Sequence, residues 1–147
     1  MPKIVAIGGG EIGRIGYPIE TTAIDQEIIK LSGKTNPKLL FIPTATHDST
    51  EYIDAVKRQF GNRLGCSIDN LLLISENNSY SKCKEKILSA DVVYVGGGDT
   101  EFMLEIWKKN GVDELLKEAH RQDIVLSGLS AGAICWFLGT HDEKKPA

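Results

Sequence analysis

Short apolar runs alternate along the chain with segments in which apolar residues recur with a helical period. The runs lie at residues 3–7, 38–42, 70–74, 91–95 and 124–127. Apolar runs of this length are typical of strands that are buried on both faces of a parallel sheet. The segments between them are predicted to be amphipathic helices, and they lie at residues 20–31, 48–60, 79–89, 101–109 and 112–120. The pattern predicts a doubly wound α/β domain, with a mostly parallel sheet and helices on both faces.

Short polar residues mark where two of these helices begin. Asp48 or Ser49 can cap the second helix, and Ser79 or Ser81 can cap the third. The sequence shows no repeat, linker or low-complexity segment. We therefore expect residues 1–147 to form a single domain, which is also what this length favours.

Glycine-containing turns follow three of the predicted strands, at Gly8, Gly96 and Gly128. Ligands of doubly wound sheets bind beyond the carboxyl ends of the strands, so these turns mark the candidate binding edge. The first turn also contains G-x-G-x-x-G, the spacing of dinucleotide-binding loops. That interpretation is disfavoured because Gly16 and Pro18 prolong the loop where a helix should begin, and because the second strand does not end in an acidic residue.

Composition and charge exclude several classes of binding partner for this protein. Of the 147 residues 41% are hydrophobic, enough for a core, and the formal net charge of −3 argues against a nucleic-acid-binding protein. No apolar run reaches the ~18 residues of a membrane span, and the run at residues 3–7 is too short for a signal peptide. Cys66, Cys83 and Cys135 form neither a metal-binding nor a disulfide pattern. We expect a cytoplasmic protein that needs no cofactor or metal and contacts neither nucleic acid nor membrane.

The stretch most informative about chemistry is SGLSAGA, which runs from Ser127 to Ala133. One apolar run precedes it and another follows it, which predicts a strand, a sharp turn and a helix. This is the layout of a nucleophile elbow, in which small neighbours such as Gly128 and Gly132 leave a serine hydroxyl exposed at the tip. Ser130 is therefore the candidate nucleophile. The alternative is a tight turn whose serine only caps the following helix.

A serine nucleophile also needs hydrogen-bond donors for the anion that forms when it attacks a carbonyl group. One donor is normally the N–H of the residue after the serine, which is Ala131 here. The triple glycine at residues 96–98 is a candidate for the second, because glycine lets backbone N–H groups approach a ligand closely. The alternatives for the triple glycine are an anion-binding loop and a plain turn.

Two motifs taken together resemble peptidase family S51, which includes dipeptidase E and cyanophycinase. They are GGGDT at residues 96–100 and GLSAGA at residues 128–133, and segments 8–10 and 42–45 are also similar to that family. The likeness covers residues 1 to about 138. It implies a fold similar to that of class I glutamine amidotransferases, with a serine where those enzymes carry a cysteine.

The same resemblance implies roles for individual residues. Ser130 takes the position of the nucleophile, and Gly98 (or Gly97) and Ala131 take the positions of the oxyanion donors. It further implies a serine peptidase or dipeptidase acting on small peptides, whose catalytic histidine lies on a later strand and is followed by an acidic partner. Only 17 residues follow Ser130, and residues 139–147 form a polar tail that does not resemble the continuation of the family.

No histidine of this chain is well placed by its sequence position to act as the base. His141 is separated from Ser130 by a predicted helix, His47 is expected beside a helix cap, and His120 is expected at a helix C-terminus. We therefore expect residues 1–147 to be the first two-thirds of such a domain, truncated at the C-terminus and weakly active or inactive.

Two alternatives remain open at this point. The open edge of the incomplete sheet would be covered either by the missing part or by a second copy in a homodimer. In function, the alternative to a peptidase is a non-catalytic domain that binds a small molecule or an anion with the same strand-end loops.

Overall fold

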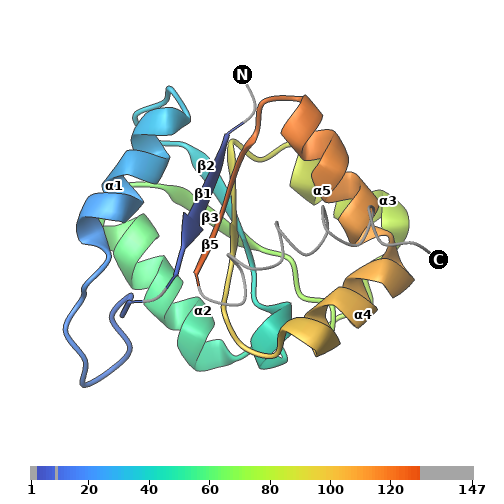
Figure 1. The fold of residues 1–147 in the computed structure, drawn as a ribbon, viewed down its shortest axis with the longest axis horizontal. Coiled ribbons are helices and arrows are strands. Elements are labelled where there is room, and N and C mark those ends of the chain that lie inside the picture. Colours follow the sequence, from blue (N-terminus) through green and yellow to red (C-terminus); the bar gives the residue numbers. More distant parts are fainter. Residues whose placement is uncertain (1–2, 9, 130–147) are drawn as a thin grey trace.

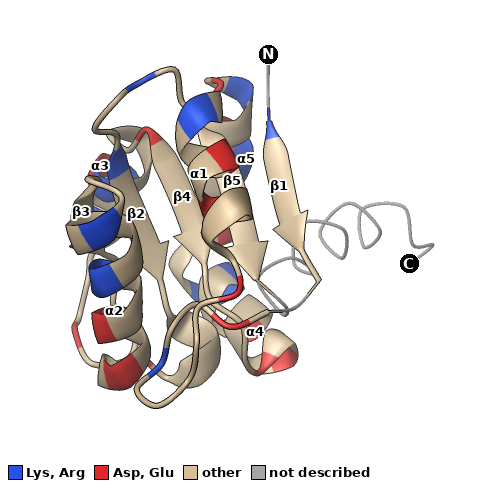
Figure 2. Ribbon diagram, turned by 90° about the vertical axis from the view of Figure 1, so that its left-hand side faces the viewer, with Lys and Arg blue, Asp and Glu red and all other residues tan. Residues whose placement is uncertain are grey.

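The structure is a computed structural model that describes residues 3–8 and 10–129 of the 147-residue chain. These residues contain one five-stranded sheet with the strand order β1-β5-β4-β2-β3, in which every neighbouring pair is parallel. Because the strands point the same way, their carboxyl ends share one edge of the sheet (Figure 2). The strands are β1 (Ile4–Ile7), β2 (Lys38–Ile42), β3 (Ser67–Asn70), β4 (Val92–Val95) and β5 (Val125–Leu129).

Helices cover both faces of the sheet, as the alternation of apolar runs and amphipathic segments predicts. Figure 1 shows α1 and α2 on one side and α3, α4 and α5 on the other. Between the strands and these helices lie two short segments, the 3₁₀ turn η1 (Thr44–Thr46) and the π-helix η2 (Lys57–Arg63). The α-helices are α1 (Thr22–Leu31), α2 (Thr50–Val56), α3 (Tyr80–Leu88), α4 (Thr100–Asn110) and α5 (Val112–Arg121).

The alternation of side chains along β2 divides the core into two layers. Leu39 and Phe41 pack in the cluster that includes the inner faces of α1 and α2. Leu40 and Ile42 pack in the cluster that includes α3, α4 and α5. All four side chains are essentially fully buried, which explains why an uninterrupted apolar run encodes a central strand.

The predicted helix caps are confirmed for α2 and α3. The hydroxyl of Ser49 accepts a hydrogen bond from the backbone N–H of Tyr52 at 3.3 Å, and that of Ser79 accepts one from Lys82 at 3.1 Å. Asp99 caps α4 in the same way, through the N–H of Phe102. These bonds satisfy N–H groups that have no partner within the helix.

The prediction of a third strand at residues 70–74 is wrong, because the strand is β3, which ends at Asn70. The N–H of Leu71 still bonds to the carbonyl oxygen of Phe41 at 2.9 Å, but the chain then leaves the sheet. Leu71 is fully buried in the layer that contains Ile87 of α3. The apolar residues that follow β3 therefore pack beside the sheet and do not form a strand of it.

Two other boundaries differ from the predicted ones. The helix expected over residues 48–60 is α-helical only to Val56 and continues as the π-helix η2. At the other end of the chain, β5 extends beyond the predicted residues 124–127 as far as Leu129, because Gly128 pairs with Ala6 on one side and Val95 on the other.

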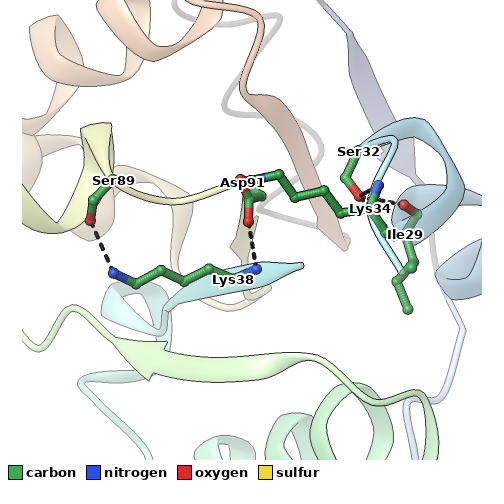
Figure 3. A network of polar contacts seen from close by, with 6 residues as sticks. All are labelled: Ile29, Ser32, Lys34, Lys38, Ser89 and Asp91. Atoms are coloured by element: carbon green, nitrogen blue, oxygen red, sulfur yellow. Dashed lines mark hydrogen bonds and ion pairs between the residues drawn. The ribbon is translucent and has the colours of Figure 1, made fainter. Parts of the chain in front are cut away.

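The amino-terminal edge of the sheet is fastened by a network of polar contacts around Asp91 (Figure 3). One carboxylate oxygen of Asp91 accepts a hydrogen bond from the ammonium group of Lys34 at 2.6 Å, and the other accepts one from the backbone N–H of Lys38 at 2.8 Å. Burial opposes ionisation of this carboxyl group, but the bonds from Lys34 and Lys38 prevail and lower its pKa. The network ties the start of β2 to the residue just before β4.

Candidate active site

A pocket of about 460 Å³ opens at the carboxyl-terminal edge of the sheet. Its walls come from four segments: the loop after β1, the segment that leads from β2 into α2, the loop after β4, and the last residue of β5. A volume of this size suits a small ligand. The pocket lies at the edge that the glycine-containing turns predicted.

The triple glycine after β4 is fixed in position by its surroundings. A Cβ atom on Gly96 would lie 2.9 Å from the Tyr52 ring and 3.1 Å from the Phe41 ring. Gly98 has a φ of +149°, and a Cβ there would lie 2.4 Å from the carbonyl oxygen of Ala45. Any side chain at either position would displace the loop, so glycine is required for its close packing.

Within this loop, Gly97 rather than Gly98 lines the pocket. The N–H of Gly97 donates a hydrogen bond to the hydroxyl oxygen of Tyr52 at 3.2 Å. Of the two glycines considered as oxyanion donors, Gly97 therefore already has a partner within the protein. Gly98 packs against the backbone of Ala45.

Tyr52 lies in the first turns of α2 and also lines the pocket. Its ring packs at 5.1 Å against the ring of Phe41, a fully buried residue of β2. Burial raises the pKa of the Tyr52 hydroxyl, so the group keeps its proton across the neutral range. The apolar period of residues 48–60 favours a buried side chain at Tyr52, but it gives no signal that the hydroxyl reaches a glycine 45 positions further along the chain.

The loop after β1 is held together by Glu11. One carboxylate oxygen of Glu11 accepts hydrogen bonds from the backbone N–H groups of Gly13 and Arg14, and the other accepts bonds from the Arg14 guanidinium group at 2.9 Å. The side-chain hydrogen bond from Arg14 is the main cause that lowers the pKa of Glu11 to about 2. Both side chains line the pocket, which therefore carries charges of both signs at this wall.

The candidate nucleophile Ser130 and the candidate donor Ala131 lie outside the described residues, as do His141 and Cys135. The residue that directly precedes Ser130 is Leu129, and its buried side chain lines the pocket. The strand half of the predicted elbow is confirmed, since Ser127 and Gly128 belong to the central strand β5. The turn and the helix of the elbow remain predictions.

No histidine is among the described residues that line the pocket. His47 follows η1 with a left-handed φ of 55°, and its ring stacks on that of Phe102 at 4.0 Å. The residue that caps α2 is Ser49, so His47 lies close to the cap, as predicted. His120 lies in the last turn of α5, which the sequence also predicted.

Other classes of site find no support in the part of the chain that the structure describes. Within residues 3–8 and 10–129 no cluster of His, Cys, Asp and Glu side chains is arranged to hold a metal ion. The dinucleotide interpretation fails structurally, because α1 begins only at Thr22 and not at the glycine-rich turn. Over the same residues, none of the helices combines the length and the apolar character needed to span a bilayer.

These features define an α/β domain whose ligand pocket lies at the carboxyl ends of a parallel sheet. The sequence profile of peptidase family S51 matches residues 4–145, a range that extends past residue 138, where we placed the end of the likeness. The chain belongs to this family.

Curated relatives agree with this assignment. The chain is 38% identical over 149 residues to the uncharacterized peptidase YgaJ of Bacillus subtilis strain 168, a match that covers 99% of this chain and 61% of that protein. It is 35% identical over 124 residues to the uncharacterized peptidase Lmo0363 of Listeria monocytogenes, covering 80% of this chain and 58% of that protein. The chain thus spans less than two-thirds of the length of these relatives.

Solved structures confirm the fold. A peptidase from an acI-B1 Actinobacterium aligns with a TM-score of 0.71 and 21% identity, covering 90% of this chain and 56% of that one. A protein assigned as a peptidase E, from Listeria monocytogenes EGD-e, aligns with a TM-score of 0.66 and 24% identity, covering 91% of this chain and 61% of that one. The doubly wound fold of the class I glutamine amidotransferase type is therefore the fold of this chain.

Proposed function

We propose that this chain carries the nucleophile and the binding pocket of a serine peptidase, with Ser130 attacking a peptide carbonyl group bound in the pocket. One observation carries the proposal. The register of β4 and β5 pairs Val95 with Gly128, so Gly97 and Ser130 each follow a paired position by two residues. The triple glycine and Leu129, the residue before the serine, thus follow neighbouring strands at the same level, and Leu129 and Gly97 line one pocket.

The proposed reaction is acyl transfer. The Ser130 hydroxyl oxygen forms a bond to the carbonyl carbon of the substrate, and its proton passes to a base and then to the leaving amine as the C–N bond breaks. Negative charge develops on the carbonyl oxygen, where N–H groups of Gly98 and Ala131 are the proposed donors. Water then hydrolyses the acyl-enzyme.

We propose a short peptide as the substrate class. The pocket is small, and its walls present Glu11, Arg14 and Glu51, so charges of both signs are available to bind a molecule that carries both. Membership of peptidase family S51 points in the same direction.

We further propose that turnover by the 147-residue chain is slow. Of the described histidines, His47 stacks on Phe102 and His120 lies at the far end of α5, and neither lines the pocket. General-base assistance is typically worth about 10²–10⁴-fold in rate, and this is the contribution that we expect to be missing.

The test is reaction of the purified chain with a fluorophosphonate probe, with Ser130→Ala as the matched control. We expect slow covalent labelling, because the probe also reacts with an activated hydroxyl group, and this labelling should map to Ser130 and disappear in the variant. Hydrolysis of aspartyl dipeptides is measured in parallel and is expected to be slow. Absence of labelling in a folded chain contradicts the peptidase proposal, and peptide or anion binding without labelling favours the non-catalytic alternative, which the Arg14 side chain in the pocket wall would serve.

A further inference from the structure

The contact between Gly97 and Tyr52 changes which groups can donate hydrogen bonds to a ligand in the pocket. The Gly97 N–H points to the Tyr52 hydroxyl oxygen at 3.2 Å, so it is not free to bond to a ligand while that contact is made. Tyr52 lines the pocket together with Gly97, and its hydroxyl group is in contact with Gly97. A phenol oxygen that accepts one hydrogen bond still carries an O–H donor of its own.

In the part of the chain that the structure describes, the Tyr52 hydroxyl does not donate its proton to any acceptor. Within residues 3–8 and 10–129, the bond from Gly97 is the hydrogen bond that the Tyr52 hydroxyl makes, and it is one that it accepts. Because the oxygen faces Gly97, the O–H bond must be directed away from that residue, and Tyr52 forms part of the pocket wall. An unused donor at a pocket wall is available to a ligand.

The Tyr52 ring is also held in place. It lies against the Phe41 ring at 5.1 Å, and the backbone of Gly96 approaches it so closely that a Cβ atom there would lie 2.9 Å from the Tyr52 ring. Ser49 caps the helix that carries Tyr52. The hydroxyl oxygen of Ser49 accepts a hydrogen bond from the backbone N–H of Tyr52 itself. A donor fixed in this way needs little reorganisation when charge develops near it.

We propose that the Tyr52 hydroxyl, oriented by the Gly97 N–H, donates a hydrogen bond to the carbonyl oxygen of the substrate and is a further oxyanion donor of this site. Gly97 then acts through Tyr52 as a positioning residue, and Tyr52 contacts the reacting atom. When a hydroxyl group accepts a hydrogen bond, the hydrogen bond that it donates becomes stronger. The bond from Gly97 therefore makes the Tyr52 hydroxyl a better donor. The inference rests on the proposed function and adds a side-chain donor to its backbone donors.

The experiment compares the labelling rates of the full chain and three variants with the fluorophosphonate probe. Tyr52→Phe removes only the hydroxyl group and keeps the ring in contact with Phe41 and Gly96. Tyr80→Phe is the matched control, because Tyr80 is an exposed residue of α3 that lies outside the pocket wall. Ser130→Ala reports labelling that is independent of the nucleophile, and the melting temperature of every variant is measured.

We expect Tyr52→Phe to slow labelling by about 10- to 100-fold, below the cost of losing an oxyanion donor in a fully assembled protease. Tyr80→Phe should label at the rate of the unaltered chain. In the Ser130→Ala background, addition of Tyr52→Phe should change the affinity for an aspartyl dipeptide less than about 2-fold, because the donor acts mainly on the transition state.

The outcomes separate the inference from the proposed function. Labelling of the unaltered chain at Ser130 together with an equal rate in Tyr52→Phe overturns the inference alone. A loss of dipeptide affinity as large as the loss of labelling rate also overturns it, since that result describes ordinary binding. Absence of labelling in the folded, unaltered chain overturns the proposed function and the inference together.

Discussion

The two edges of this sheet are built by opposite means. At the amino-terminal edge, side chains fasten the strands to one another, and Asp91 bonds to both Lys34 and the backbone of Lys38. At the carboxyl-terminal edge, backbone shape defines the structure, with a positive φ at His47, Asp48 and Gly98. The pocket described above lies at the second edge.

The difference shows how one sheet can be both stable and open. Side chains that link neighbouring strands, as at the amino-terminal edge, occupy the space above the strand ends. That arrangement leaves no room for a ligand. Glycine loops leave that space free, and they hold their shape by close backbone contact, as Gly98 does against Ala45. The left-handed backbone of the non-glycine residues His47 and Asp48 persists only where the surrounding structure enforces it. The comparison predicts that substitutions at the two edges have separable consequences.

The largest effect is expected from Gly98→Ala at the carboxyl-terminal edge. The new Cβ atom would lie 2.4 Å from the Ala45 carbonyl oxygen, at a φ that alanine rarely adopts. We expect a loss of about 2–4 kcal/mol in the free energy of unfolding, measured by urea denaturation, together with loss of probe labelling.

Gly8→Ala is the matched control for that substitution. Gly8 follows β1 at the same edge, but a Cβ atom there would have no neighbour within 4 Å. Its stability should stay within about 0.5 kcal/mol of the unaltered chain. Equal losses in the two variants would show that the glycine loop after β4 has no special packing requirement.

A smaller effect, of a different kind, is expected from Asp91→Ala at the amino-terminal edge. The side chain of Asp91 is 22% exposed and accepts two hydrogen bonds, so its removal should lower the free energy of unfolding by about 1–2 kcal/mol. Labelling at the pocket should keep its rate, because the network lies at the opposite edge. A fall in labelling rate beyond what the lost stability explains would break the separation of the two edges.

The smallest effect concerns pH and the loop after β1. The folded pKa of Glu11 is about 2, below the ordinary value of 4.5, so its contribution to stability is complete above pH 4.5 and is lost as the pH falls through about 2. Arg14, its partner, is half exposed, and we expect at most about 1 kcal/mol. Urea denaturation at pH 5 and pH 3 should show a larger decrease for the unaltered chain than for Glu11→Gln, and parallel decreases would contradict this assignment.

Strands that carry an apolar run were predictable from the sequence, including the edge strand β1, whereas the edge strand β3 was not. β2 and β4 are buried on both faces, so hydrophobicity alone marks them. β3 is an edge strand with the sequence SIDN, in which only Ile68 is apolar. Its position is fixed by pairing with β2, where Lys38 is opposite Ser67, and no local pattern records that pairing.

The location of the pocket, though not the site residues themselves, was predictable from the sequence. Parallel strands deliver their carboxyl ends to one edge, so the glycine turns after β1 and β4 and the serine after β5 were expected to converge there. The hydrogen bond between Tyr52 and Gly97 depends on how α2 packs over β2 and β4, and a helix period cannot supply that information. The ion pair between Glu11 and Arg14 also depends on the geometry of the loop, which the sequence pattern does not reveal.

The pairing of β1 with β5 has a consequence for the order in which the protein is assembled. β1 contains residues 4–7, and the strand beside it in the described sheet contains residues 125–129. During synthesis, the first of these five strands must therefore wait for the last of them before it can join the sheet, and closing so long a loop is slow. The wall of the pocket that follows β1 therefore cannot be attached before β5 has been made. Nascent chains that stop short of residue 125 should leave the ribosome with their first strand unpaired and exposed to aggregation.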